Sequence, residues 1–198
     1  MNFRKQYNEF MLLKRLTAFF LDITEVVVFA IAIFLFVYLL ILQPHKIKGD
    51  SMVPNFLDGE YLLTDKITYR IREPARGDVV VFEAPGAGGD EFIKRIIGLP
   101  NEKISLNNGY IFINEQKLGE AYIPETVNTQ GGNFIKDDQE IIVPNESYFV
   151  MGDNRAASSD SRTWGFISKA AISGKAWVIY WPPSKVGVIE RVTYKANN

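Results

Sequence analysis

The sequence predicts a mainly β domain preceded by one N-terminal transmembrane α-helix. The first observation is a run of 17 residues from Val26 to Leu42 that contains no charged side chain. Extended back to Ile23, a helix of this length rises about 30 Å, which is enough to cross the hydrocarbon core of a membrane. The second observation is that short runs rich in valine, isoleucine, tyrosine and phenylalanine alternate with turn residues after residue 44, as they do in β proteins.

The apolar run divides the chain. We expect an amphipathic cytoplasmic segment at 1–22, a transmembrane anchor at 23–42 and an extracytoplasmic domain at 43–198. A buried core helix rarely contains so many apolar residues, and a cleavable signal peptide needs small residues after its apolar run. The residues that follow are Gln43, Pro44, His45 and Lys46. The sequence therefore predicts an uncleaved anchor.

The basic residues near the run predict its orientation. Four precede it and two follow it closely: Arg4, Lys5, Lys14 and Arg15, then Lys46 and Lys48. Basic residues are enriched on the cytoplasmic side of membrane spans. We therefore expect a single-pass protein of the cell membrane, with its N-terminus in the cytoplasm.

The strands of the domain can be placed by their composition. The runs that we expect to be strands are 61–64, 78–82, 92–97, 103–106, 110–113, 141–143, 147–151 and 175–180. The run 78–82 is almost continuously apolar, which indicates a strand buried on both faces. Asn107-Asn108-Gly109 separates two runs and predicts a tight hairpin. Residues 103–147 suit a small cap subdomain, and 168–172 is the best short helix.

Composition excludes several kinds of chemistry. The chain has no cysteine and one histidine, His45, so cysteine zinc sites, thiolate nucleophiles and multi-histidine metal sites are impossible. A Ser-His-Asp triad could use only His45. With 22 basic and 23 acidic side chains, the net charge of −1 gives no basic field for nucleic acid. We expect no metal and no organic cofactor.

Lysine is then the obvious base for a serine nucleophile. Lys94 lies in the apolar string 92–97, and side chains of a strand alternate between faces, so Lys94 shares a face with Phe92 and Ile96. An apolar environment penalises the ammonium form and can lower a lysine pKa by several units. A neutral lysine can take the proton of a serine hydroxyl, as in known Ser-Lys pairs.

Three sequence blocks carry a resemblance to a known family. Ser51 lies in Gly49-Asp50-Ser51-Met52-Val53-Pro54, Lys94 and Arg95 begin a block that ends at Pro100, and a dense polar block spans 152–165. In this order behind an N-terminal span, they resemble bacterial type I signal peptidases, with matching blocks from Gly49 to Gly165. The resemblance implies a membrane-bound serine endopeptidase with a signal-peptidase-like β fold. It would remove signal peptides from exported preproteins.

The resemblance also implies a role for each matching residue. Ser51 would be the nucleophile, and Lys94 the neutral base that later protonates the leaving amine. Ser158 matches the serine that hydrogen-bonds and orients the lysine, and the backbone N–H of Ser51 would stabilise the oxyanion, with Gly49 and Asp50 beside it. We expect structural support from salt bridges among Arg95, Asp153, Asp160 and Arg162.

The family's preference for small residues at the first and third positions before the cut implies shallow apolar pockets. By position, the lining residues would be Ile47, Met52, Val81, Phe92 and Ile93. The expected partners are signal peptides of preproteins and the lipid bilayer, which Met52, Val53 and Phe56 would touch. No nucleic acid is expected, and a monomer is favoured.

The sequence departs from the family at three places. Asn55 and Phe56 replace the usual Thr-Leu, Gly49 lacks the second hydroxyl donor of some members, and Asn101 replaces a common glycine. Two other readings stay open. One is a non-catalytic membrane-anchored β binding module. The other is a self-cleaving Ser-Lys protease of the same clan, although such proteases are cytosolic and carry a DNA-binding region.

Overall fold

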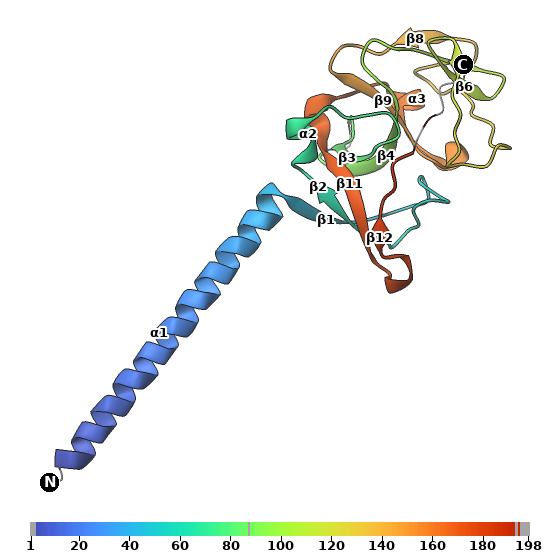
Figure 1. Cartoon of the computed structure of the whole chain (residues 1–198). Coiled ribbons are helices and arrows are strands. Elements are labelled where there is room, and N and C mark those ends of the chain that lie inside the picture. The colour runs from blue at the N-terminus through green and yellow to red at the C-terminus, as the bar shows by residue number, and fades with distance from the viewer. Residues whose placement is uncertain (1–2, 87, 193, 195–198) are drawn as a thin grey trace. The chain divides into compact units, whose positions relative to one another are not determined.

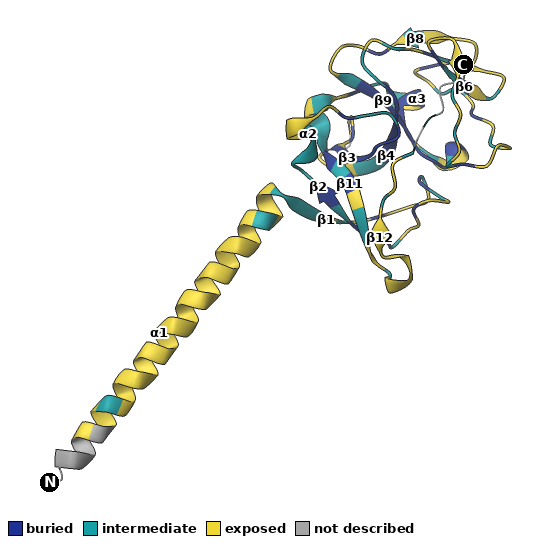
Figure 2. Cartoon of the chain, in the orientation of Figure 1, coloured by how far each residue is buried: buried dark blue, intermediate teal, exposed yellow. Residues whose placement is uncertain are grey.

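The computed structural model describes residues 3–86, 88–192 and 194, and the chain divides into two compact units at 1–41 and 42–198. The first unit contains one helix, α1 (Phe3–Leu40); within its stretch Glu9–Leu40, an 18-residue window has a mean hydropathy of 2.7 and no buried residues. Its apolar side chains are exposed along its length (Figure 2). One continuous helix thus covers the described part of the segment predicted at 1–22 and most of the span predicted at 23–42. It ends at Leu40, two residues before the predicted end of the span.

The main sheet of the second unit is antiparallel and has eight strands (Figure 1). Its order is β1 (Leu42–Lys46), β2 (Tyr61–Asp65), β11 (Ile172–Trp181), β3 (Val79–Glu83), β4 (Glu91–Gly98), β9 (Ser147–Met151) and β10 (Ile167–Ser168), with β12 (Gly187–Val188) paired to β11. The predicted strands of this sheet are confirmed. The sequence did not predict β1, because Leu42 continues the apolar run of the helix.

A smaller sheet of four strands lies within the segment predicted as a cap. Its order is β7 (Gln116–Lys117), β6 (Tyr110–Ile113), β5 (Lys103–Asn107) and β8 (Glu140–Ile142). Asn107 pairs with Tyr110, so only Asn108 and Gly109 form the loop. Both have positive φ, 50° and 80°, as a type I′ turn requires. The predicted hairpin is confirmed.

The remaining elements are short. They are α2 (Thr68–Ile71), α3 (Ser161–Trp164) and the 3-10 turns η1 (Arg155–Ala157), η2 (Lys169–Ala171) and η3 (Pro183–Lys185). The helix expected at 168–172 is only the single 3-10 turn η2. Ser168 caps this turn, and Ile172 already begins β11.

Strand β3 separates two apolar clusters, as the prediction of a doubly buried strand requires. Val79 and Val81 pack with Ile47, while Val80 and Phe82 pack with Tyr148 on the opposite face. A third cluster fills the space between the small sheet and β9. In Figure 2 the buried residues concentrate in β3, β4 and β9. Lys94 and Arg95 lie on β4, one of these well-buried central strands.

Candidate active site

Ser51 and Lys94 meet although they lie 43 positions apart in the sequence. Ser51 lies in the turn after β1, and Lys94 lies in the middle of β4. The Lys94 Nζ and Ser51 Oγ atoms are 2.9 Å apart, and Nζ also lies 2.9 Å from the carbonyl oxygen of Ile93. A hydroxyl and an amine at this distance can exchange a proton directly.

The environment of Lys94 favours its neutral form. The residue is only 3 % exposed, and its Nζ lies 5.2 Å from the centre of the Phe92 ring, so the predicted shared face is confirmed. Burial lowers the pKa of Lys94 to about 8, although the negative charges of Asp160 and Asp153 oppose this shift. A usable fraction of the amine is therefore neutral near physiological pH.

The loop that carries Ser51 is held from below by the polar block at 152–165. The backbone N–H of Asn154 donates to the Ser51 carbonyl at 3.0 Å, and its side-chain amide donates to the Asp50 carbonyl at 3.0 Å. Gly152 must be a glycine here, because a Cβ atom would lie 2.4 Å from the Ser51 carbonyl oxygen. The sequence suggested no role for Asn154, although it lies inside the polar block that was singled out.

The structure places Ser158 at the site without the predicted hydrogen bond to Lys94. Its Oγ is buried and has no partner among the described residues. A Cβ on Gly152 would lie 2.2 Å from this atom, so the serine packs tightly against the loop that supports Ser51. The contacts of Lys94 Nζ go to Ser51 and to the Ile93 carbonyl instead.

The three residues expected at the oxyanion site differ in whether their polar backbone groups are already hydrogen-bonded to the described residues. The N–H of Gly49, a residue with φ of +80°, donates to Asp58 Oδ1 at 2.7 Å and is therefore occupied. Asp50 contributes its carbonyl, which accepts from Asn154. The N–H of Ser51 donates to no described residue, so it remains free for a developing oxyanion.

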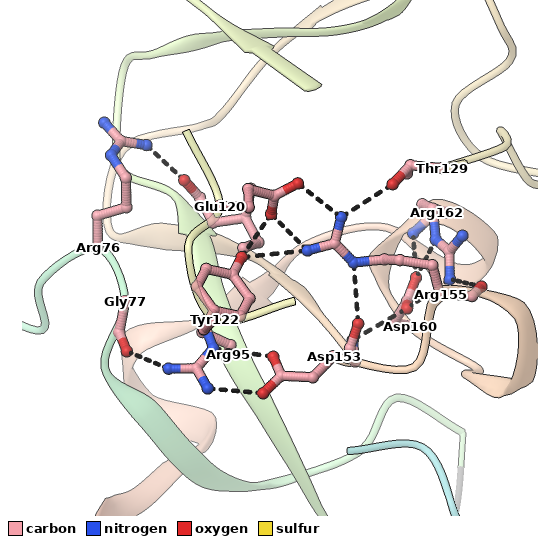
Figure 3. Close-up of polar contacts among 12 residues, drawn as sticks. Arg76, Gly77, Arg95, Glu120, Tyr122, Thr129, Asp153, Arg155, Asp160 and Arg162 are labelled. Carbon is pink, nitrogen blue, oxygen red and sulfur yellow. Dashed lines mark hydrogen bonds and ion pairs between the residues drawn. The ribbon is translucent and has the colours of Figure 1, made fainter. Parts of the chain in front are cut away.

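The four residues expected to give support form two buried ion pairs (Figure 3). Arg95 holds Asp153 through two hydrogen bonds of 2.8 and 2.6 Å, and Arg162 holds Asp160 through two of 2.8 and 2.9 Å. Asp160 also accepts from the backbone N–H of Gly152 at 3.1 Å. The second pair therefore fixes the glycine beneath Ser51.

A further polar network escaped the sequence analysis. Arg155 donates to both carboxylate oxygens of Glu120 and to Thr129, which belong to the segment after the small sheet's hairpin (Figure 3). The Arg95 guanidinium stacks 4.2 Å from the centre of the Tyr122 ring. Arg155 stood in the polar block, but nothing in the sequence indicated that Glu120 would be its partner.

Asn55, one of the departures from the family pattern, now has a structural role. Its side-chain amide lies 2.8 Å from the Tyr122 carbonyl and 2.8 Å from Asp153 Oδ2, and it donates to both. Through Asp153 the loop after Ser51 is connected to Arg95, the neighbour of Lys94 on β4. Asn55 therefore connects the nucleophile loop to the strand that carries the lysine.

A groove of about 500 Å³ opens beside Ser51 and Lys94. Of the predicted pocket residues, Ile47, Val81, Phe92 and Ile93 line it. Met52 does not: it is fully buried in the cluster below, because it points away from the groove into the core.

The prediction that Met52, Val53 and Phe56, in the loop after Ser51, touch lipid is wrong for Met52 and Phe56. Met52 is fully buried and Phe56 is 3 % exposed, since both pack in the cluster with Leu62. Large exposed apolar residues lie instead on β11 and the turn that follows it, among them Tyr180, Trp181 and Val186.

Comparisons with known proteins agree on one family. The model of the family "Signal peptidase, peptidase S26" matches residues 20–181. A probable signal peptidase I-2 of Synechocystis is 33% identical over 174 residues, covering 85% of this chain and 77% of the relative. Signal peptidase IB of Staphylococcus aureus is 33% identical over 156 residues, covering 73% and 81%. A crystal structure of a signal peptidase I from Enterococcus faecalis V583 matches with 31% identity and a TM-score of 0.43, over 53% of this chain and 97% of that chain. The chain belongs to the signal peptidase family, peptidase S26, and is a serine endopeptidase of the kind that removes signal peptides.

Proposed function

We propose that this protein is a membrane-anchored signal peptidase that cuts exported preproteins after small residues, of the Ala-x-Ala type, by means of a Ser51/Lys94 dyad. The observation that carries the proposal is the distance of 2.9 Å between Ser51 Oγ and a lysine amine whose pKa burial lowers to about 8. An exposed lysine with an ordinary pKa would be a poor base at neutral pH.

The reaction proceeds through an acyl-enzyme. Lys94 Nζ takes the hydroxyl proton of Ser51 as Oγ attacks the carbonyl carbon before the scissile bond. The oxyanion accepts from the free N–H of Ser51. When the tetrahedral intermediate collapses, the Lys94 ammonium gives its proton to the leaving amine, and the ester of Ser51 remains. Water then attacks this ester, Lys94 takes the water proton, and the proton returns to Ser51 as the carboxylic product leaves.

The substrate binds as an added strand. On β4, the residues Glu91–Lys94 pair with β3, while pairing with β9 begins only at Arg95. On the other side of the groove, β1 is the terminal strand of its sheet. Both edges have unpaired backbone groups, which an extended peptide between them can use. The apolar floor of Ile47, Val81 and Ile93 suits small side chains.

The long apolar helix supports anchoring in the bilayer. The stretch Glu9–Leu40 is long enough to span the membrane, and the basic residues that precede the most apolar part favour a cytoplasmic N-terminus. In this arrangement the catalytic unit at 42–198 is extracytoplasmic and meets preproteins at the membrane surface. The bilayer and the signal peptide are then the two partners of the protein.

The decisive experiment is cleavage of a preprotein with Ala-x-Ala before its mature start by the full chain in detergent. Ser51→Ala and Lys94→Ala are the test variants, and Ser105→Ala and Lys103→Ala on β5 are matched controls. We expect cleavage after the second alanine by the wild type and both controls, and a loss of at least about 10³-fold in both test variants. Equal cleavage by all proteins would refute the dyad. A folded wild type that does not cleave would refute the substrate class.

A further inference from the structure

Four polar side chains from four different strands of the main sheet form a hydrogen-bonded chain. His45 Nε2 lies 2.8 Å from Glu91 Oε2, and His45 Nδ1 lies 2.9 Å from Thr64 Oγ1. The hydroxyl of Ser173 donates to the other oxygen of Glu91. The strands involved are β1, β2, β11 and β4, and none of these residues has a role in the proposed chemistry.

The contact between His45 and Glu91 joins strands that are not neighbours. In the sheet order, β2, β11 and β3 lie between β1 and β4. Four strand spacings of ~4.8 Å would separate them by ~19 Å in a flat sheet. The 2.8 Å contact therefore needs a strongly curled sheet, and it directly connects the two walls of the groove. The contact of Ser51 with Lys94 also connects the segment after β1 with β4.

The charge state of Glu91 fixes how the histidine is held. Partial burial raises the pKa of Glu91, but hydrogen bonds from Ser173 and His45 outweigh this effect, and the pKa lies below its ordinary value. A carboxylate can only accept, so His45 donates to Glu91 from Nε2, while Nδ1 lies within hydrogen-bond distance of the Thr64 hydroxyl. Both ring nitrogens have partners, which fixes the orientation of the imidazole.

The position of this bridge along the groove follows from strand geometry. Glu91 and Ile93 lie on the same face of β4, and Ile93 is opposite Val81 in the register. Val81 and Ile93 both line the groove close to Lys94. The substrate residue directly before the cut would sit against these two side chains. The third residue before the cut presents its side chain on the same side of an extended peptide, ~6.8 Å further along. Glu91 is two residues from Ile93 on β4, so the His45–Glu91 bridge lies about the same distance from Ile93 along the groove.

We propose that the His45–Glu91 bridge is the specificity-determining end wall of the subsite for the third residue before the cut. It holds the two groove walls at a fixed separation and fills the space that a longer side chain would need. This inference rests on the proposed peptidase function. It assigns His45 and Glu91 a part in choosing the substrate, and no part in proton transfer.

The test uses the full chain in detergent and two sets of preproteins. One set carries alanine, valine or leucine at the third position before the cut, with alanine kept at the first. The second set varies the first position and keeps alanine at the third. The variants are His45→Gln and His45→Asn, because a glutamine amide can reach Glu91 in place of Nε2, whereas an asparagine amide can reach only Thr64. Glu91→Ala removes the other partner, and kcat/KM is measured for every pair.

We expect His45→Asn and Glu91→Ala to raise the kcat/KM ratio of leucine to alanine at the third position by about 10-fold or more. His45→Gln should keep a ratio within about threefold of the wild type, and the ratios at the first position should not change in any variant. Relaxation in both His45 variants alike, an equal relaxation at both positions, or no relaxation in a folded His45→Asn would overturn the proposal. If the wild type leaves the Ala-x-Ala substrate intact, the peptidase function fails first, so the two failures are distinguishable.

Discussion

At the scale of single residues, the site depends on a lysine that the fold keeps away from water. We expect kcat/KM to increase as the pH rises through about 8 and to level off above it, because the pKa of Lys94 is lowered to about 8 and only the neutral amine accepts the Ser51 proton. A profile of kcat/KM between pH 6 and 10 measures this, with circular dichroism to confirm that the protein stays folded. A profile that is flat from pH 6 to 9 would contradict the assignment.

The burial of Lys94 also lowers the free energy of unfolding, because the ammonium form is disfavoured in the folded protein. The folded pKa of about 8 lies below the ordinary value of 10.5, so the unfolded chain binds more protons. The cost is fully present below pH 8 and disappears as the pH rises toward 10.5. We expect Lys94→Met to raise the free energy of unfolding at pH 7 by about 1–3 kcal/mol while it abolishes cleavage. Urea unfolding at pH 7 and pH 10 checks this, and an equal gain at both pH values would exclude the charge as its cause.

Asn55 is a second residue where a single change is informative. Its amide hydrogens bind the Tyr122 carbonyl and Asp153 Oδ2, and both acceptors would repel a carboxylate. We expect Asn55→Asp to lower the free energy of unfolding by about 2 kcal/mol and Asn55→Ala by about 1 kcal/mol. Thermal unfolding of both variants measures the difference, with the exposed Asn145→Asp as control. If Asn55→Asp and Asn55→Ala lowered the free energy of unfolding equally, the assignment of Asn55 as a hydrogen-bond donor would be wrong.

At the scale of the elements, the β5–β6 hairpin depends on its turn. Gly109 has φ of +80°, and a Cβ atom there would lie 2.4 Å from Asn128 Oδ1. We expect Gly109→Ala to reduce the free energy of unfolding by about 1–3 kcal/mol. Gly119→Ala is the matched control, because nothing lies within 4 Å of its Cβ position. Denaturant unfolding compares the two, and a Gly109→Ala protein as stable as the control would show that the turn tolerates an alanine.

The hairpin also shows which parts of this fold are readable from sequence. Asn108 and Gly109 specify their turn through local backbone preferences, and the alternating runs beside them are local signals too. Strand β1 gave no such signal, because Leu42 continues the apolar helix and Pro44 cannot donate to a strand partner. Its pairing with β2 is decided by tertiary packing.

The sequence also predicted some parts of the candidate site and missed others. The pairing of Ser51 with Lys94 was predicted from the blocks that resemble a family, supported by the apolar neighbours of the lysine. The partners of His45 and Asn55 were not predicted, because Glu91 and Tyr122 lie far away in the sequence and meet them only in the folded sheet. Likewise the apolar character of Met52 and Phe56 did not reveal whether they face lipid or the core.

At the scale of the whole molecule, the chain joins a helix of exposed apolar residues to a domain with its own cores. The helix ends at Leu40 and β1, the wall of the groove, begins at Leu42. Ser51 follows only a few residues after this strand. In the proposed function the helix spans the bilayer, and the short chain between Leu40 and Ser51 would then limit how far the nucleophile can lie from the membrane surface. Orientation across the membrane then decides whether the protein can meet its substrates at all.

The orientation can be tested directly because the chain contains no cysteine. Glu9→Cys introduces one thiol before the most apolar part of the helix, and Asn145→Cys introduces one on the exposed loop between β8 and β9. We expect a membrane-impermeant thiol reagent to label only Cys at position 145 in intact cells, and to label both positions after the membrane is permeabilised, because the preceding basic residues favour the cytoplasmic side. Cleavage of the Ala-x-Ala preprotein by both variants confirms that they are folded. Labelling of position 9 alone in intact cells would reverse the topology and place the groove on the cytoplasmic side, away from exported substrates.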